Sequence, residues 1–120
     1  MSKTICVIDD EPGILNELQI WLKEQGFNVI TAASGDEAFE KMNVTKPHLV
    51  LLDIVMPKTD GLEVLSQLKR NKRTASIPVI MLTAKMETRT IMKAQGMEAT
   101  DYFFKPFNTD ELLFSIKKHL

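Results

Sequence analysis

The chain has 120 residues, of which 44% are hydrophobic and 26% are charged, as in an ordinary soluble globular protein with one domain. Its formal net charge of −1 excludes a general attraction to nucleic acid or to anionic membranes. No apolar stretch approaches the roughly 20 residues that span a bilayer, and the N-terminus has no signal peptide. The single cysteine, Cys6, excludes an internal disulfide and fits a reducing compartment, so we expect a cytoplasmic protein.

Short apolar runs alternate with amphipathic segments from the start of the chain. The first run, Ile5–Ile8, is followed by a helix signal, because Pro12 suits a first helical turn and apolar residues then recur at helical spacing. Gly26 follows the last turn, where glycine adopts the left-handed capping conformation at little cost in free energy. Residues 27–32 then read as a weaker, half-exposed strand that suits a sheet edge.

The middle of the chain repeats this alternation. Ser34 and Glu37 form a capping box, which predicts that a second helix begins there. The run Leu49–Leu52 follows as a third strand, and a second capping box at Asp60 opens a third helix. Val79–Leu82 is the fourth predicted strand.

The last third of the chain completes five strand–helix units. A polar, methionine-containing helix is predicted over roughly residues 87–95, then a strand over Tyr102–Phe104 and a helix capped by Asn108. Continuous apolar strands separated by helices indicate a parallel sheet that is covered on both faces. The predicted fold is a flavodoxin-like, doubly wound α/β domain over residues 1–120, with five parallel strands in the order 2-1-3-4-5.

Polar side chains close four of these five strands. They are two acids after the first strand, one acid after the third, a hydroxyl after the fourth and an ammonium after the fifth: Asp9, Asp10, Asp53, Thr83 and Lys105. Right-handed crossovers place the carboxyl ends of parallel strands at one edge of the sheet, so these side chains should converge. Such a convergence predicts phosphate and metal chemistry.

The three acids need a cation. Two carboxylates about 5 Å apart repel by roughly 3 kcal/mol at an effective dielectric near 20. Helix capping accounts for either Asp9 or Asp10 but not for Asp53, whereas Mg²⁺ (or Mn²⁺) binds such hard oxygen ligands together with waters and phosphate.

The residues alone leave three roles open for Asp53, which could be a metal ligand, a base or a nucleophile. As a nucleophile it would form an aspartyl phosphate, which needs in-line approach and neutralised phosphoryl oxygens. Lys105 could then supply a point charge and Thr83 a hydroxyl donor.

Over essentially its whole length, the chain resembles the receiver domain of bacterial two-component response regulators. Five segments in order carry the resemblance: Val7-Ile8-Asp9-Asp10-Glu11-Pro12, Leu51-Leu52-Asp53-Ile54-Val55-Met56-Pro57, Asp60-Gly61, Leu82-Thr83-Ala84 and Lys105-Pro106-Phe107. One such motif is weak evidence, but five in order, each at the end of the expected strand, are a specific signal.

The resemblance implies a phosphorylation-controlled switch. Asp53 matches the phosphoacceptor, which receives a phosphoryl group from a sensor histidine kinase, a phosphotransfer protein or a small phosphodonor. Asp9 and Asp10 match the magnesium-binding acidic pair, with Asp53 and the backbone carbonyl of Val55 as further ligands. Such a domain catalyses only its own phosphoryl transfer and dephosphorylation, so it is a signalling protein rather than an enzyme.

Other matched residues carry the signal and set its lifetime. Lys105 matches the family's lysine, and its bond to Pro106 is expected to be cis. Thr83 matches the switch hydroxyl, and Tyr102 matches the aromatic residue that turns inward when this hydroxyl moves. The flanking residues of the phosphoryl group, which tune access of water, would be Val55 and Lys85, and they lead us to expect slow self-dephosphorylation.

One position departs from the family pattern. Receivers usually have Gly-Ala shortly before the fifth strand, where this chain has Glu98-Ala99, with Gly96 two residues earlier. Because a left-handed cap costs a non-glycine residue free energy, we expect the fourth helix to end early, at Gly96.

The partners and the competing functions follow from this match. Phosphorylation should remodel the fourth helix, fifth strand and fifth helix for a downstream protein, a covalent output domain or a second copy in a phosphorylation-dependent dimer. We expect no output domain in this chain and no direct contact with nucleic acid or membrane. An aspartyl-phosphate phosphatase would want an acid where Val55 stands, and a flavodoxin-like redox carrier would want a Ser/Thr/Gly-rich loop after the first strand. The complete acidic set, with Thr83 and Lys105, argues against a degenerate receiver that only docks.

Overall fold

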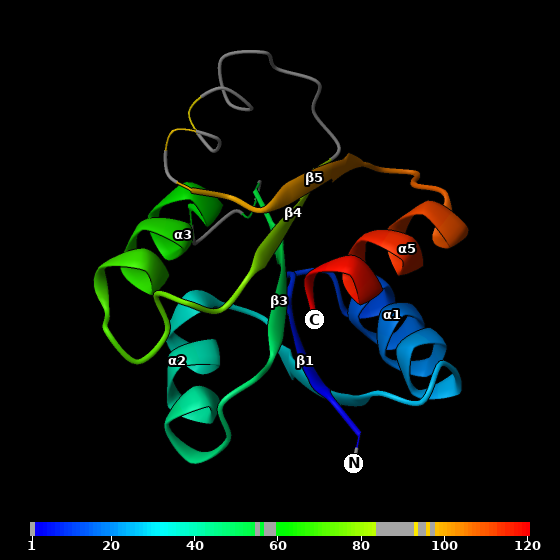
Figure 1. Ribbon diagram of the computed structural model, residues 1–120, viewed down its shortest axis with the longest axis horizontal. Coiled ribbons are helices and arrows are strands. Elements are labelled where there is room, and N and C mark those ends of the chain that lie inside the picture. The colour runs from blue at the N-terminus through cyan, green and yellow to red at the C-terminus, as the bar shows by residue number, and fades with distance from the viewer. Residues whose placement is uncertain (1, 55, 57–59, 84–92, 94–95, 97) are drawn as a thin grey trace.

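The computed structural model describes residues 2–54, 56, 60–83, 93, 96 and 98–120. Five parallel strands form one sheet in the order β2-β1-β3-β4-β5, as predicted (Figure 1). The strands are β1 Thr4–Ile8, β2 Asn28–Ala32, β3 Leu49–Asp53, β4 Val79–Thr83 and β5 Asp101–Phe104. The half-exposed strand β2 lies at one edge of the sheet, which agrees with its weak apolar pattern.

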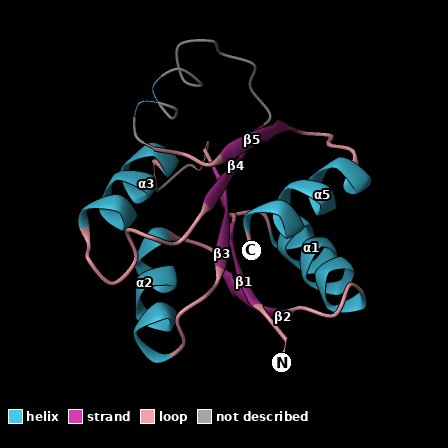
Figure 2. Ribbon diagram, viewed as in Figure 1, coloured by secondary structure: helices cyan, strands magenta, loops and turns pink. Residues whose placement is uncertain are grey.

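The described helices cover both faces of this sheet. They are α1 Pro12–Glu24, α2 Gly35–Val44, α3 Gly61–Arg70 and α5 Thr109–His119. Helices α1 and α5 lie on one face, and α2 and α3 lie on the other (Figure 2). Of the predicted helix over residues 87–95, the structure describes only Lys93, which is helical. In the part of the chain that the structure describes, no helix combines the length and hydrophobicity of a membrane crossing.

Two hydrophobic cores, one on each face, explain why the strands read as unbroken apolar runs. In β1, Cys6 and Ile8 join the core under α2 and α3, whereas Ile5 and Val7 join the core under α1 and α5. Every residue of β1, β3 and β4 is buried. Alternation would have appeared only if one face met water, so continuous hydrophobicity was the correct signal for this sheet.

Local capping sets the helix boundaries that the sequence predicted. The Ser34 hydroxyl accepts a hydrogen bond from the N–H of Glu37 at 3.2 Å, and Asp60 accepts one from the N–H of Leu62 at 2.9 Å. Beyond α1, Gly26 has a φ of 92°, which confirms the predicted left-handed cap. These contacts fix where α2 and α3 begin and where α1 ends.

The left-handed cap is not at Gly96, and the predicted end of the fourth helix at Gly96 stays a prediction because Met97 lies outside the described residues. Gly96 is helical, and the left-handed residue is Glu98, with a φ of 69°. This conformation costs a non-glycine residue about 1–2 kcal/mol. Burial lowers the pKa of the nearby Lys69 ammonium, and the negative charge of Glu98 partly offsets this shift.

Cys6 is expected to resist thiol reagents in the folded protein. Its side chain is buried, and burial raises the pKa of the thiol from 9.0 to about 12, so the reactive thiolate is scarce at pH 8. Iodoacetamide should add its mass only after the chain unfolds, as measured by intact mass with and without denaturant. The raised pKa also implies stability that is complete below pH 9.0 and falls as the pH rises toward 12. Rapid labelling of the native chain at pH 8 would contradict this burial.

Candidate functional site

The carboxyl edge of the sheet brings together the residues that close its strands. Asp53 is the last residue of β3 and pairs with Leu82 of β4, while Ile8 of β1 pairs with Leu52. This register places the ends of the three central strands side by side. The positions that follow β1, β3, β4 and β5 therefore meet at one edge, as expected for parallel strands joined by right-handed crossovers.

The three acids form one cluster. Each of Asp9, Asp10 and Asp53 offers a carboxylate oxygen, and these atoms lie within 4.8 Å of one another. Asp9 is 1% exposed and Asp53 is 4% exposed, whereas Asp10 is half-buried. Carboxylates this close and this buried need a cation, because burying an unpaired charge is expensive.

Lys105 supplies one such cation from the end of β5. Its Nζ lies 2.8 Å from Oδ2 of Asp9 and 3.4 Å from Oδ2 of Asp53, and its side chain is 15% exposed. Burial by itself lowers the pKa of Lys105, but the hydrogen bond to Asp9 and the charges of both carboxylates raise it above its ordinary value. The ammonium is therefore charged at neutral pH and bridges two of the three acids.

The backbone holds these side chains in place. The N–H of Lys105 donates to the carbonyl of Thr83 at 2.8 Å, and the Lys105–Pro106 peptide bond is cis. Asp9 uses both oxygens, since Oδ1 accepts from the N–H of Glu11 at 3.0 Å and Oδ2 binds Lys105. Asp9 thus turns the chain toward α1 while it contributes charge to the site.

Thr83 and Tyr102 lie on the neighbouring strands β4 and β5. Thr83 is 1% exposed at the end of β4 and pairs with Phe104. Tyr102 is half-buried, packs against the core under α2 and α3, and meets Phe104 edge-on with 6.4 Å between ring centroids. Both residues lie on the strands that the sequence predicts, and their switch role stays a prediction. Val55 and Lys85 lie outside the described residues, so their tuning role stays a prediction.

Two features of this region were not predicted. An apolar pocket of about 390 Å³ lies between α1 and the segment that follows β5, and Lys105 is part of its wall. Its apolar lining consists of Ile14, Leu18, Trp21, Pro106 and Phe107. The spacing of the three α1 residues, four and then three apart, is the signal that places them on one helix face. The second feature is Gly61, whose position in a motif was noted but whose contact with Asp53 has no signature in the sequence.

The fold and the site together define a CheY-like α/β domain with an acidic cluster, partly neutralised by lysine, at the carboxyl edge of its sheet. The sequence matches the profile of the response regulator receiver domain over residues 5–117. The chain therefore belongs to the receiver domain family of two-component response regulators, which is a signalling family.

Curated relatives agree with this assignment. The alkaline phosphatase synthesis transcriptional regulatory protein PhoP of Bacillus subtilis is 42% identical over 117 residues, covering 98% of this chain and 48% of the relative. The phosphate regulon transcriptional regulatory protein PhoB of Pseudomonas aeruginosa is 40% identical over 119 residues, covering 98% of this chain and 51% of the relative. The chain thus spans about half the length of these relatives.

Solved structures agree as well. The chemotaxis protein CheY4 of Vibrio cholerae superposes with a TM-score of 0.93 at 26% identity, covering all of both chains. The N-terminal domain of a response regulator receiver protein from Methanoculleus marisnigri is 42% identical, with a TM-score of 0.79, covering 98% of this chain and 95% of that one.

Proposed function

We propose that residues 1–120 form one receiver domain in which Asp53 accepts a phosphoryl group in a metal-dependent reaction. One observation carries this proposal. Three carboxylates lie within 4.8 Å of one another, and Lys105 bridges Asp9 and Asp53. Lys105 offsets one of three negative charges, so the four side chains keep a net charge of −2. That excess fits a divalent cation, and the all-oxygen ligand set favours Mg²⁺ (or Mn²⁺).

Asp9, Asp10 and Asp53 would hold this ion, with the carbonyl of Val55 as the further ligand that the family match suggests. When bound, the ion would neutralise charge on the phosphoryl oxygens. It would also reduce the mutual repulsion of the three carboxylates, and this gain would add to the free energy of binding.

The chain's own residues would carry out the transfer. A carboxylate oxygen of Asp53 attacks phosphorus in line, the bond from phosphorus to the donor's histidine nitrogen breaks, and the electron pair leaves with the imidazole. The Lys105 ammonium, 3.4 Å from Asp53, is near enough to contact a phosphoryl oxygen once the new bond has formed. Burial of Asp53 limits access of water to the acyl phosphate, and we propose that Val55 and Lys85 tune that access.

The donor protein would dock beside the site. The apolar pocket between α1 and the segment after β5 shares Lys105 with the acidic cluster. A sensor histidine kinase or a phosphotransfer protein could rest an apolar helix face there while its histidine reaches Asp53. We propose this pocket as the contact surface for the phosphodonor.

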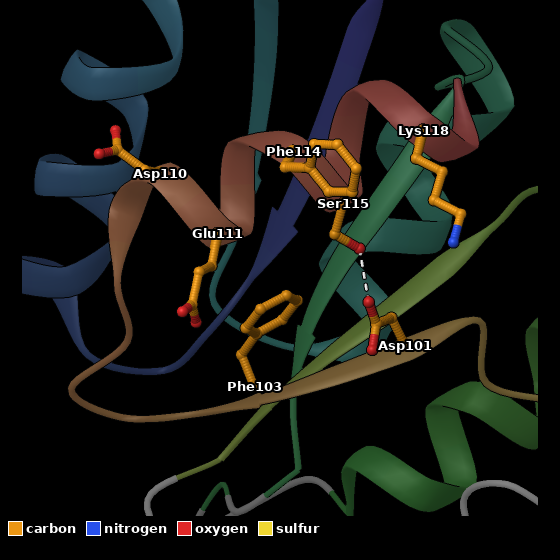
Figure 3. Close-up of a pocket in the computed structure, with 7 residues that line it drawn as sticks. All are labelled: Asp101, Phe103, Asp110, Glu111, Phe114, Ser115 and Lys118. Atoms are coloured by element: carbon orange, nitrogen blue, oxygen red, sulfur yellow. Dashed lines mark hydrogen bonds between the residues drawn. The ribbon is translucent and has the colours of Figure 1, made fainter.

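The signal would leave through β5 and α5. The Thr83 hydroxyl would move toward the phosphoryl group, and Tyr102 would turn inward behind it. Figure 3 shows the pocket formed by β5 and α5, in which the Ser115 hydroxyl donates to Asp101 at 2.6 Å. Phe114 beside it is 71% exposed and would offer a partner an apolar contact. The occupant would be a downstream protein, a covalent output domain or a second copy of the domain.

Incubation with phosphoramidate tests the core of this proposal. The chain should gain one phosphoryl mass with Mg²⁺ and none with EDTA, as read by intact mass. Asp53→Ala should gain none, while Asp110→Ala, an exposed acid on α5, should label like wild type. Equal labelling of Asp53→Ala, or labelling that ignores Mg²⁺, would refute the proposal.

A further inference from the structure

Gly61, the first residue of α3, lies directly against the backbone that carries Asp53. A Cβ atom built on Gly61 would lie 2.3 Å from the carbonyl oxygen of Asp53, 2.6 Å from the Cα of Ile54 and 2.8 Å from the carbonyl oxygen of Ile54. All three distances are shorter than non-bonded atoms tolerate. Each neighbour is backbone, so no flexible side chain can move aside.

The requirement at Gly61 is space rather than backbone freedom. Among the described glycines only Gly26 has a positive φ, so Gly61 has a conformation that alanine adopts readily. Gly13, near the start of α1, provides a comparison, because a Cβ there would meet nothing within 4 Å. The two glycines therefore differ in what surrounds them.

Neither the end of β3 nor the start of α3 can move easily to relieve such a contact. The N–H of Ile54 donates to the carbonyl of Leu82 at 3.0 Å, which ties the end of β3 to β4. The N–H of Gly61 donates to the carbonyl of Ile54 at 3.0 Å, which ties the start of α3 to the residue after β3. Helix α3 is anchored by its buried face, formed by Val64, Leu65 and Leu68. The peptide group between Asp53 and Ile54 is thus held between β4 on one side and Gly61 on the other.

We propose that Gly61 is a positioning residue for the Asp53 carboxylate: its bare Cα lets α3 sit on the Asp53–Ile54 peptide and so fixes Asp53 relative to Asp9 and Lys105. This inference rests on the proposed function of Asp53. The carboxylate oxygens lie within 4.8 Å of one another, and Nζ of Lys105 lies 3.4 Å from Asp53. A methyl group on Gly61 must displace either α3 or the end of β3 by several tenths of an ångström. Misplacement of a reacting group by about 1 Å costs roughly 10²-fold in rate.

Gly61→Ala, with Gly13→Ala as the matched control, tests the proposal. Calorimetry on the unphosphorylated chain gives the Mg²⁺ affinity, and intact mass gives the rate of phosphoryl uptake at saturating Mg²⁺ and phosphoramidate. We expect Gly61→Ala to bind Mg²⁺ several-fold more weakly and to label about 10–100-fold more slowly even at saturation. Gly13→Ala should match wild type within about twofold in both, as expected for a surface substitution. A folded Gly61→Ala chain with wild-type affinity and saturated rate would overturn the proposal.

Two further arms keep the outcome decisive. If Gly61→Ala is partly unfolded by circular dichroism, both measurements are repeated in trimethylamine oxide, which favours the folded state. A chain that stays unfolded there would also overturn the proposal, because Gly61 would then serve folding and not the placement of Asp53. Failure of the proposed function has a different signature, since wild type itself would take up no phosphoryl group while the calorimetric comparison still judges Gly61.

Discussion

Lys105→Met is expected to destabilise the metal-free chain by about 3–5 kcal/mol, because removing one partner of a buried ion pair strands the other charge. Nζ of Lys105 lies 2.8 Å from Asp9, whose side chain is 1% exposed, and 3.4 Å from Asp53. Without the ammonium, three clustered carboxylates would have no cation among these four side chains. Urea unfolding in EDTA measures the loss.

The same substitution should respond more strongly to Mg²⁺ than wild type does. The acidic cluster carries one more uncompensated charge in Lys105→Met, so the ion should restore more of the free energy of unfolding. Phosphoryl uptake should nevertheless fall by about 10²–10³-fold, since a positioned donor to the developing charge is missing. Lys118→Met, an exposed lysine on α5, is the control and should change neither quantity. Wild-type stability of Lys105→Met in EDTA would show that the ion pair is not what holds the carboxylates together.

Mg²⁺ is expected to stabilise the unphosphorylated chain by about 2.7 kcal/mol at 100 times its dissociation constant, because the proposed site exists in the folded chain and not in the unfolded one. Thermal unfolding at rising MgCl₂ measures this effect. NaCl at the same ionic strength should give little, since it screens charge without occupying the three carboxylates.

Asp10→Asn separates specific binding from screening. Asp10 is the half-buried member of the cluster, so its replacement removes one charged ligand with less disturbance than a change at Asp9 or Asp53. The variant should gain less from Mg²⁺ than wild type at every concentration. Equal gains from MgCl₂ and NaCl, or an unchanged response in Asp10→Asn, would exclude a metal site at these acids.

The fold was predictable because burial on both faces leaves a direct trace in the sequence. Leu49–Leu52 is apolar throughout because its side chains alternate between two cores, and the polar residue after it marks the carboxyl end of the strand. Caps at Ser34 and Asp60 depend on contacts within one helical turn, so they too are readable locally.

Features that depend on distances between remote backbones were not predictable. The contact between Gly61 and Asp53 arises from how α3 packs, and nothing beside either residue in the sequence indicates it. The left-handed residue was predicted at Gly96 on local preference alone, but the structure has it at Glu98. The convergence of acids and lysine was predicted, whereas the shorter distance from Lys105 to Asp9 than to Asp53 came only from the structure.

The hydrogen bonds of Asp101 separate two kinds of residue on the surface of β5 and α5: those that the fold needs and those that can be substituted. One oxygen of Asp101 accepts from the buried Ser115 hydroxyl and the other accepts from the N–H of Tyr102. This acid is therefore occupied within the fold, and a partner on the proposed surface would meet chiefly the exposed residues of α5, such as Glu111 and Lys118. Substitutions at those exposed positions should cost the fold little, so the proposed partner surface can be altered while the hydrogen bond between Ser115 and Asp101 stays in place.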